Sequence, residues 1–266
     1  MKLNIVPART GWLWVRAGLR TFWQQPLALS GLFFLFITVM SVASLVPYLG
    51  NALALGLLPA ATLGLMAATR EASQGKFPMP SILISAFRAG RQQARAMAVL
   101  GVIYALGFLA VLGISALFDG GDFARLYLVG GSLTREMVES PAFQNAMWVA
   151  MALYLPLSLL FWHAPALVHW HGVSPAKSLF FSGVACLRNF GAMTLFLLGW
   201  LGVFSLVGAG LLMLSMALGQ PELMGMLMFP ASLLLAAMFF CSIYFSFRDS
   251  FVTDDAETSP PNPSSP

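Results

Sequence analysis

The stretch from Leu27 to Thr69 contains no Asp, Glu, Lys or Arg. A helix needs about 20 residues to cross about 30 Å of hydrocarbon, so this stretch can hold two crossings. Pro47, Gly50 and Asn51 divide it, because proline cannot continue a helix, glycine turns freely and asparagine can cap the next helix. Only 9% of all residues are charged, which is too few to cover a soluble surface of this size. The sequence therefore predicts a polytopic membrane protein.

Six apolar segments without charge are predicted to span the membrane as helices, and the period-2 alternation of a β-barrel is absent. The approximate bounds of these segments, spans 1 to 6, are residues 27–46, 52–69, 97–118, 146–170, 191–218 and 223–247. The predicted fold class is all-α, with residues 1–252 forming a single six-helix transmembrane domain. The tail, residues 253–266, is acidic and rich in proline and serine, and is predicted to be a disordered cytoplasmic segment.

Lys and Arg residues are distributed unevenly among the segments between these spans. All but two of the 14 basic residues precede span 1, separate spans 2 and 3 or spans 4 and 5, or follow span 6; the exceptions are Arg125 and Arg135. Because basic residues concentrate on the cytoplasmic side, both termini are predicted to lie in the cytoplasm of a bacterial inner membrane. Span 1 is too long, and preceded by too long a segment, to suggest a cleaved signal peptide. Cys186 and Cys241 are not expected to form a disulfide.

Residues 10–25 are predicted to form an amphipathic helix at the membrane interface, ahead of span 1. One arc of this helix is apolar and comprises Trp12, Val15, Leu19, Phe22 and Trp23. Arg16 and Arg20 lie beside the arc, and the tryptophans, Trp14 included, suit the headgroup layer. We expect an anchor that fixes orientation, and the alternative is a sensor of lipid or of a partner.

Two further segments between spans are predicted to form short interfacial helices, one starting near Ser81 and one at Ser174 and Pro175. Four arginines in these segments are the candidate lipid- or anion-binding residues: Arg88, Arg91, Arg95 and Arg188. The first three are spaced three and four residues apart, so they are expected to share one helix face. Each basic residue near an anionic leaflet contributes about 1 kcal/mol to membrane binding. The alternative is that these arginines only mark the cytoplasmic side.

The two interfacial segments also match each other at an offset of 97 residues. The matched pairs are Pro78 with Pro175, Ser81 with Ser178, Ser85 with Ser182 and Arg91 with Arg188. Together with the topology, these matches predict a parallel internal repeat in which each unit consists of a span, an interfacial helix and a second span.

Small residues at regular helical spacing indicate where membrane helices approach closely. The stripe in span 2 comprises Ala52, Gly56, Ala60, Gly64 and Ala68, and the stripe in span 5 comprises Gly199, Gly202, Ser205 and Gly208. We expect both stripes to pack within the molecule, and the alternative is a homodimer seam or a membrane-protein partner. Pro156 and Pro165 in span 4 and Pro230 in span 6 are expected to kink their helices.

Several chemistries are missing from the sequence. The spans contain no charged residue, which argues against proton- or sodium-coupled transport. No HExxH, GxSxG, Walker or CxxC motif is present, so an enzyme is not expected. His163, His169 and His171 lie together at the end of span 4, but their helical positions diverge and no other histidine exists to complete a metal or haem site. No cofactor, no metal and no nucleic-acid partner is therefore expected.

The region around Pro165 to Asn189 resembles an uncharacterised family of six-pass proteobacterial inner-membrane proteins, and more loosely the wider YciC-like group with domains of unknown function. The resemblance rests on the blocks 161–167 (FWHAPAL), 172–178 (GVSPAKS) and 186–189 (CLRN), together with Ser182, and extends from about Leu3 to Phe251. It implies an inner-membrane location and six helices, and it brings no substrate and no catalytic residue.

These observations favour a non-enzymatic inner-membrane protein that contacts anionic lipid or a membrane partner through its basic interfacial helices. The alternative is a transporter or channel for a small neutral or lipophilic solute. A cavity lined by the serines and threonines of spans 4 to 6 would favour transport, whereas a solid core would favour the first function.

Overall fold

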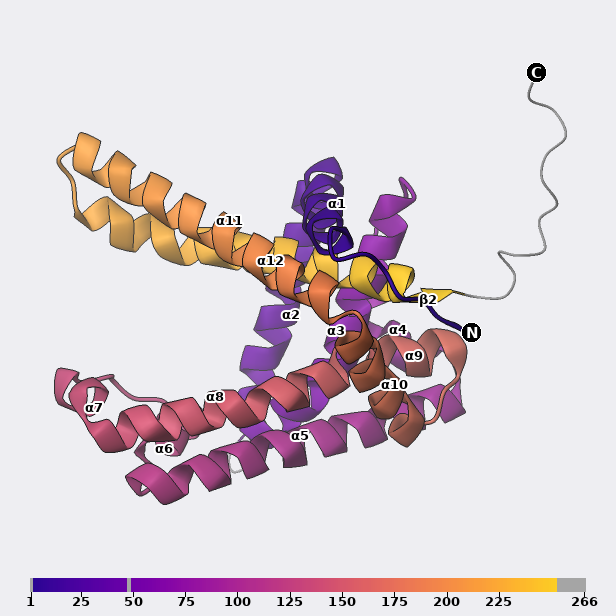
Figure 1. Ribbon diagram of the computed structural model, residues 1–266, viewed down its shortest axis with the longest axis horizontal. Helices are drawn as coiled ribbons and strands as arrows, with labels where there is room; N and C mark the ends of the chain where they lie inside the picture. Colours follow the sequence, from indigo (N-terminus) through magenta and orange to yellow (C-terminus); the bar gives the residue numbers. More distant parts are fainter. Residues whose placement is uncertain (1, 47–48, 253–266) are drawn as a thin grey trace, which may run out of the picture. The chain divides into compact units, whose positions relative to one another are not determined.

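The computed structural model describes residues 2–46 and 49–252 (Figure 1). The turn expected at Pro47 and the tail from residue 253 onward lie outside the described residues. In chain order the elements are β1 (Lys2–Leu3), α1 (Thr10–Gln24), α2 (Pro26–Ser44), α3 (Gly50–Ser73), a 3-10 helix η1 (Pro80–Ile84), α4 (Ser85–Arg88), α5 (Arg91–Asp119), α6 (Asp122–Val129), α7 (Arg135–Glu139), α8 (Pro141–Phe161), α9 (Ala164–His171), α10 (Pro175–Arg188), α11 (Phe190–Ala217), α12 (Glu222–Ser250) and β2 (Phe251–Val252).

Six helical segments are long and apolar enough to cross a membrane. They are α2, α3, α5, the combined stretch of α8 and α9, α11 and α12. Each of them overlaps one of the six predicted spans, so the all-α polytopic fold is confirmed. The end positions differ by a few residues because helices continue past the apolar core into polar flanks, as α5 does by starting at Arg91.

The described residues form two compact units. Unit 1 contains residues 2–33, 65–82 and 184–252, and unit 2 contains residues 34–64 and 83–183. The helices α2, α3 and α10 each contribute residues to both units. The uncharged gaps in the sequence locate spans but carry no information about which spans pack together, so this division was not foreseen.

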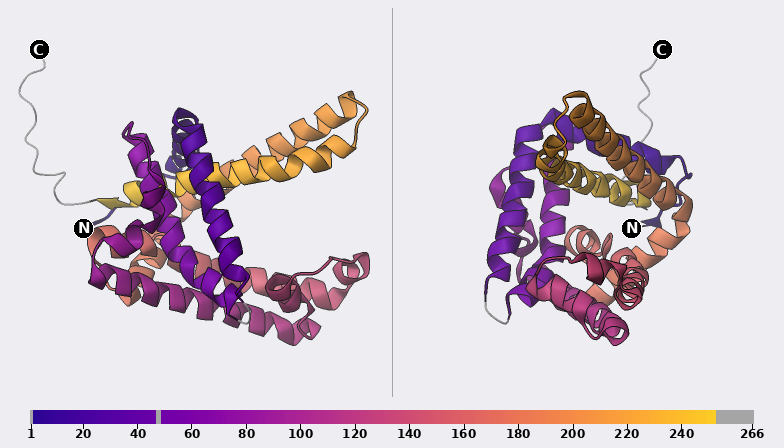
Figure 2. Two further views of the ribbon diagram at one scale, coloured as in Figure 1. Left: turned by 180° about the vertical axis from the view of Figure 1, so that it is seen from behind. Right: turned by 90° about the vertical axis from the view of Figure 1, so that its left-hand side faces the viewer.

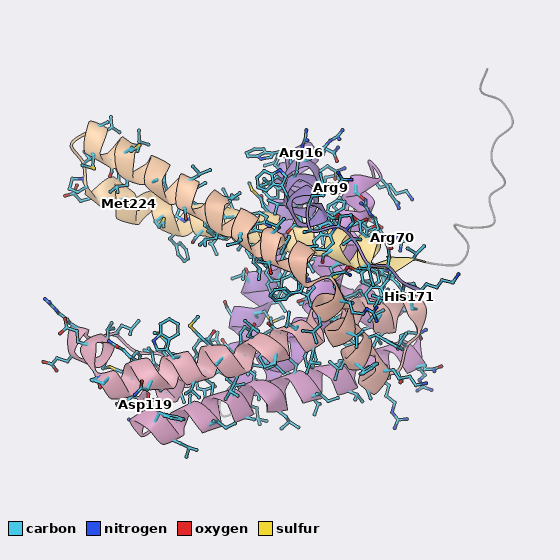
Figure 3. All side chains as sticks on the ribbon, viewed as in Figure 1. Arg9, Arg16, Arg70, Asp119, His171 and Met224 are labelled. Atoms are coloured by element: carbon cyan, nitrogen blue, oxygen red, sulfur yellow. The ribbon has the colours of Figure 1, made fainter. Side chains whose placement is uncertain are left out.

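In unit 1, α11 and α12 form an antiparallel hairpin, and α1 packs across the end of the hairpin that lies away from its turn (Figures 1 and 2). Gly219 makes the turn with a φ of 64°, which favours glycine. Two glycines let α1 approach closely: a Cβ on Gly11 would collide with the backbone carbonyl of Ala192, and a Cβ on Gly18 would lie 2.5 Å from the Cβ of Ser242. Arg9 and Arg16 lie near this end, and Met224 marks the turn end (Figure 3).

The buried face of α1 differs from the predicted apolar arc. Trp14 is 1% exposed, its Nε1 donates to Asp249 Oδ2 at 3.0 Å, and its ring meets Phe196 edge-on. Trp12 and Trp23 remain more than half exposed. The prediction that Trp14 lies in the headgroup layer is therefore wrong, because α11 and α12 cover that side of the helix.

The two ends of the described chain meet in unit 1. β1 and β2 pair antiparallel, with Lys2 opposite Val252 and Leu3 opposite Phe251. The next residue, Asn4, extends the contact by donating its Nδ2 hydrogen to the backbone carbonyl of Asp249 at 2.9 Å. This ladder was not predicted, because strands of two residues are too short to show an alternating pattern.

Asn189, at the junction of α10 and α11, is buried and joins three segments of unit 1. Its Oδ1 accepts from the backbone N–H of Val6 at 2.9 Å. Its Nδ2 donates to the carbonyl oxygen of Asn4 at 3.1 Å and contacts Ser250 Oγ at 3.4 Å. One side chain thus connects the N-terminal arm, the start of α11 and the end of α12.

In unit 2, α5 and α8 run antiparallel side by side, and α6 and α7 lie at the end where the chain passes from one to the other (Figures 1 and 2). The α3 part of this unit approaches α5 backbone to backbone, since a Cβ on Gly101 would collide with the carbonyl oxygen of Gly56. Gly64 lies equally close to η1, where an added Cβ would be 2.7 Å from Leu83 Cα. Two glycines of the span 2 stripe, Gly56 and Gly64, therefore lie at close contacts within unit 2.

The predicted stripe in span 5 packs only in part. Gly199 contacts Trp12 and Val15 of α1 within unit 1. An added Cβ at Gly202 would meet no atom within 4 Å among the described residues, and one at Gly208 would reach only a methionine side chain. The expectation of close packing along the whole stripe is thus wrong beyond Gly199, because α1 covers only that end of α11.

A side chain interrupts the long helix of span 4. α8 ends at Phe161 and α9 begins at Ala164, one residue before Pro165. Between them, Ser182 Oγ accepts from the backbone N–H of His163 at 2.9 Å and donates to the carbonyl oxygen of Leu159 at 2.8 Å. These two backbone groups are four residues apart and would bond directly in an unbroken helix, so the hydroxyl has inserted into the hydrogen-bond ladder. The helix of span 4 thus breaks just before Pro165, whereas α8 and α12 continue through Pro156 and Pro230.

The internal repeat is not confirmed. The first interfacial segment consists of η1 and α4 and stops at Gly90, whose φ is 118°, whereas the second is one continuous helix, α10. At the offset of 97 residues, Arg91 is the first residue of α5 but Arg188 is the last residue of α10. The sequence matches do not account for Gly90, which permits the break in only one of the two segments.

Candidate functional site

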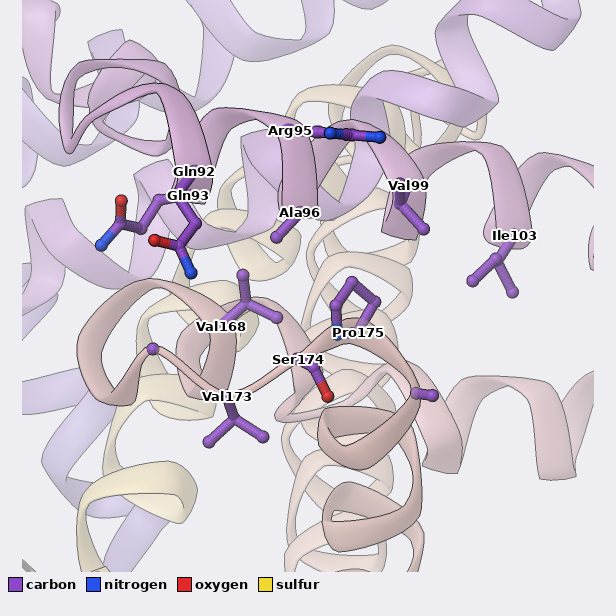
Figure 4. A pocket seen from close by; sticks show the side chains of 12 residues that line it. Gln92, Gln93, Arg95, Ala96, Val99, Ile103, Val168, Val173, Ser174 and Pro175 are labelled. Carbon is purple, nitrogen blue, oxygen red and sulfur yellow. The ribbon is translucent and has the colours of Figure 1, made fainter.

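A groove of about 670 Å³ lies in unit 2 between the start of α5 and the corner where α9 meets α10 (Figure 4). Its polar side chains are those of Gln92, Gln93, Arg95 and Ser174. Its apolar side chains include Val99 and Ile103 of α5. Its volume lies in the range typical of ligand pockets, about 300–1,000 Å³.

Two glycines shape this groove. Gly90, with a φ of 118°, separates α4 from α5 and lets α5 begin at Arg91. Gly172, with a φ of 62°, ends α9, and its N–H donates to the carbonyl oxygen of Leu167. Pro175 then starts α10, as predicted from the Ser174-Pro175 pair. The starts of two helices, α5 and α10, therefore lie at the groove.

One helical stripe of α5 combines the polar and the apolar parts of the groove. Arg95, Val99 and Ile103 follow one another at intervals of four residues, so they lie on the same side of the helix, and all three line the groove. Figure 4 shows Ala96 on α5 facing Val168 and Pro175 across it. An amphiphilic ligand could place a charged group at Arg95 and an apolar chain along Val99 and Ile103.

The charge of the groove is positive. Arg95 is exposed and lines it, and Arg91 lies one turn earlier on the same helix, also exposed. No Asp or Glu is among the lining residues. A guanidinium binds phosphate or carboxylate through two parallel hydrogen bonds, and its weak hydration suits a partly apolar site. The groove therefore favours an anionic group over a cation.

The four predicted anion-binding arginines do not form one cluster. Arg95 lines the groove, Arg91 lies beside it on α5, and Arg88 belongs to α4 on the other side of Gly90. Arg188 belongs to unit 1, whereas the other three belong to unit 2. The prediction that Arg88, Arg91 and Arg95 share one helix is wrong, because Gly90 interrupts it. Sequence reasoning missed Gln92 and Gln93, which could have been noted as amides beside an arginine at a helix start.

The remaining candidate residues are those of the span 2 stripe and the three histidines. Ala60 and Ala68 of the span 2 stripe are buried, and Ala52 is half-buried. His163 is 1% exposed and precedes α9, while His169 and His171 occupy the last turn of that helix. Within residues 2–46 and 49–252, no group of three or more His, Cys, Asp or Glu residues is placed to hold a metal ion.

The comparison with known proteins gives one informative match. The chain is 42% identical over 254 residues to the probable inner membrane protein BTH_II0599 of Burkholderia thailandensis strain E264, and the alignment covers 94% of each protein. No family model matches the chain, and no solved structure matches it. The six apolar helices and this match agree on a multi-pass protein of the inner membrane. The chain belongs to the same family of probable inner membrane proteins as BTH_II0599.

Proposed function

We propose that this protein is a non-enzymatic inner-membrane protein that binds anionic phospholipid in the groove at the start of α5. The observation that carries the proposal is the stripe of Arg95, Val99 and Ile103 along one wall of a cavity of about 670 Å³. The phosphate would contact the Arg95 guanidinium and the amides of Gln92 and Gln93, and an acyl chain would follow Val99 and Ile103 toward the middle of the span.

The exposed face of α1 supports the same function from unit 1. Trp12, Arg16, Arg20 and Trp23 are all exposed and lie on one side of the helix, opposite the buried Gly11 and Gly18. Tryptophan rings favour the headgroup layer, and arginines beside them attract anionic headgroups. No Asp or Glu occurs in α1, so this face has no internal counter-charge on its own helix.

The serines of spans 4 to 6 give little support to the transport alternative. Ser158, Ser215, Ser232 and Ser242 each donate to the backbone carbonyl three residues earlier in their own helix. Ser242 also accepts from Trp200 Nε1 at 3.0 Å within unit 1. The proton of each of these hydroxyls is bonded within its own helix, and none of these four serines lines the groove.

Replacing Arg95 by glutamine is expected to remove most of the stabilisation that anionic lipid gives, because the amide cannot form the charged pair with phosphate. The protein would be placed in nanodiscs of phosphatidylcholine with or without phosphatidylglycerol, and its melting temperature measured. Losing one such contact costs about 1.5–3 kcal/mol, which is about a tenfold or greater loss of affinity. Arg95→Lys should retain part of the effect, because lysine keeps the charge but not the planar fork.

The matched control is Arg125→Gln, which removes another exposed arginine of unit 2, in α6. This variant should respond to phosphatidylglycerol as the parent does. An equal response of Arg95→Gln and parent protein to the anionic lipid would disprove lipid binding at the groove.

The proposal also places both termini in the cytoplasm, which cysteine labelling can test. Cys186 and Cys241 are buried, and burial raises the pKa of the Cys186 thiol to about 12. Because the thiolate is the reactive form, a maleimide at neutral pH should not label the native cysteines. A cysteine at the exposed Ser132 should be labelled by an impermeant maleimide from the periplasm, and one at the exposed Ser81 should not. The opposite pattern would invert the topology.

A further inference from the structure

A second hollow in unit 2 lies further along α5, where α6 and α8 pack against it. Its volume is about 190 Å³, and its walls include Phe108, Phe123, Tyr127, Ala150, Met151 and Tyr154. None of its lining residues is charged. This hollow is separate from the groove at the start of α5, because the two share no lining residue.

Aromatic rings form most of the walls of this hollow. The Phe108 ring meets Tyr154 edge-on, with centroids 5.9 Å apart, and lies 5.5 Å from the Tyr127 ring. The Phe123 ring lies 6.2 Å from Tyr127 on the α6 side. Aromatic pairs favour edge-to-face and offset arrangements with centroids about 4.5–7 Å apart, so a further ring can join this set without disturbing it. An apolar cavity of about 150 Å³ is large enough to hold benzene, so 190 Å³ suits one substituted six-membered ring.

One tyrosine hydroxyl in the wall of this hollow has a proton available for a ligand. The Tyr104 and Tyr154 hydroxyl oxygens lie 3.5 Å apart, and either can donate to the other. Tyr154 lines the hollow, whereas Tyr104 is not among the lining residues and is just 8% exposed. Because a buried hydroxyl needs a hydrogen-bond partner, we expect Tyr104 to donate to Tyr154. The Tyr154 proton can then be donated to an acceptor oxygen about 2.8 Å away.

We propose that this hollow binds a neutral, membrane-soluble molecule whose six-membered ring carries a carbonyl oxygen. The ring lies among Phe108, Tyr127 and Tyr154, and the carbonyl oxygen accepts a hydrogen bond from the Tyr154 hydroxyl. The absence of charged lining residues excludes an ionised ligand from this site, because an unpaired charge in an apolar environment is costly. A plain acyl chain would fill the space but leave the Tyr154 proton without an acceptor.

The test compares two probes that share a ring and a decyl tail: decylubiquinone, which carries ring carbonyls, and decylbenzene, which does not. The full chain would be placed in phosphatidylcholine nanodiscs, and its melting temperature measured over a range of each probe. We expect decylubiquinone to raise the melting temperature in a saturable manner and decylbenzene to have no such effect. An equal rise with decylbenzene would overturn the proposal, because it would identify a site that takes any lipophilic chain.

Variants at the hollow make the test specific. Tyr154→Phe keeps the ring and removes the donor, so it should weaken decylubiquinone binding by up to about tenfold. Tyr104→Phe removes the hydroxyl that orients Tyr154 and should weaken binding less. Ala150→Leu fills the hollow and should abolish the response to decylubiquinone. If Ala150→Leu does not fold, Met151→Phe takes its place, because Met151 is exposed and its replacement fills the hollow from the rim. Tyr244→Phe in α12 of unit 1 is the matched control and should respond as the parent does. Unchanged binding in both tyrosine variants at the hollow would refute the proposal.

Discussion

Replacing Gly101 by leucine is expected to prevent most of the protein from folding. A Cβ at this position collides with the carbonyl oxygen of Gly56, and both groups belong to backbone, so no side chain can move aside. Overpacking usually costs about 1–3 kcal/mol and more where the main chain must shift, so we expect the upper end of that range or beyond. The measurements are the yield of monodisperse protein in detergent and its melting temperature.

The control for this prediction lies on the same helix. A Cβ on Gly113 of α5 would meet no atom within 4 Å among the described residues. Leucine is favoured over glycine in a helix interior by about 0.8–1 kcal/mol, so Gly113→Leu should fold as well as the parent or better. Equal damage from both substitutions would mean that leucine is poorly tolerated in α5 generally, and that the contact of α3 with α5 is not a close-packed seam.

Removing the hydroxyl of Ser182 is expected to destabilise the junction of α8 and α9. In Ser182→Ala, the backbone N–H of His163 and the carbonyl oxygen of Leu159 both lose their partner. Each unsatisfied buried group costs about 1–3 kcal/mol, so a loss of about 2–4 kcal/mol in the free energy of unfolding is expected. Pro165 keeps the helix from re-forming a regular ladder through this point, since proline has no N–H. Thermal unfolding in detergent would measure the change.

Ser178→Ala is the matched control, because Ser178 is also buried in α10 but donates only to the Pro175 carbonyl of its own helix. Its removal should cost less than Ser182→Ala, since no group of another helix loses a partner. Ser182→Thr should retain part of the stability by keeping a hydroxyl at the site. A melting temperature of Ser182→Ala equal to that of the parent would show that the two backbone groups pair directly once the hydroxyl is gone.

The spans could be predicted because their signal is local. Uncharged runs of sufficient length mark helices that cross the membrane whatever they pack against, and Ala or Gly at every fourth residue of span 2 predicted close approach. The packing partners could not be predicted, because they depend on contacts between distant segments. The arc of α1 illustrates this: its periodicity cannot tell that Trp14 is covered by α11 and α12 while Trp12 and Trp23 remain exposed.

The candidate site was predictable to a smaller extent. Arg95 was expected from its place among basic residues before span 3, and it does line the groove. The opposite wall comes from the corner after Gly172, more than 70 residues away in the chain, and no local pattern connects the two. The sequence also leaves the role of Gly90 open, since a glycine can lie within a helix or end it. The φ of 118° shows that Gly90 separates two helices.

The joining of the chain ends in unit 1 sets an order of assembly. α1 is synthesised early, yet Phe196 and Asp249, the partners of Trp14, lie in α11 and α12, which are synthesised much later. All segments of unit 2 have been made once the ribosome has passed residue 183, so that unit can form first. Until then the apolar side of α1 must lie against lipid. The exposed tryptophans and arginines of α1 suit it to this position at the membrane interface. β1 and Asn4 can complete their hydrogen bonds only after the end of α12 has been synthesised, so this contact forms late in the assembly of unit 1.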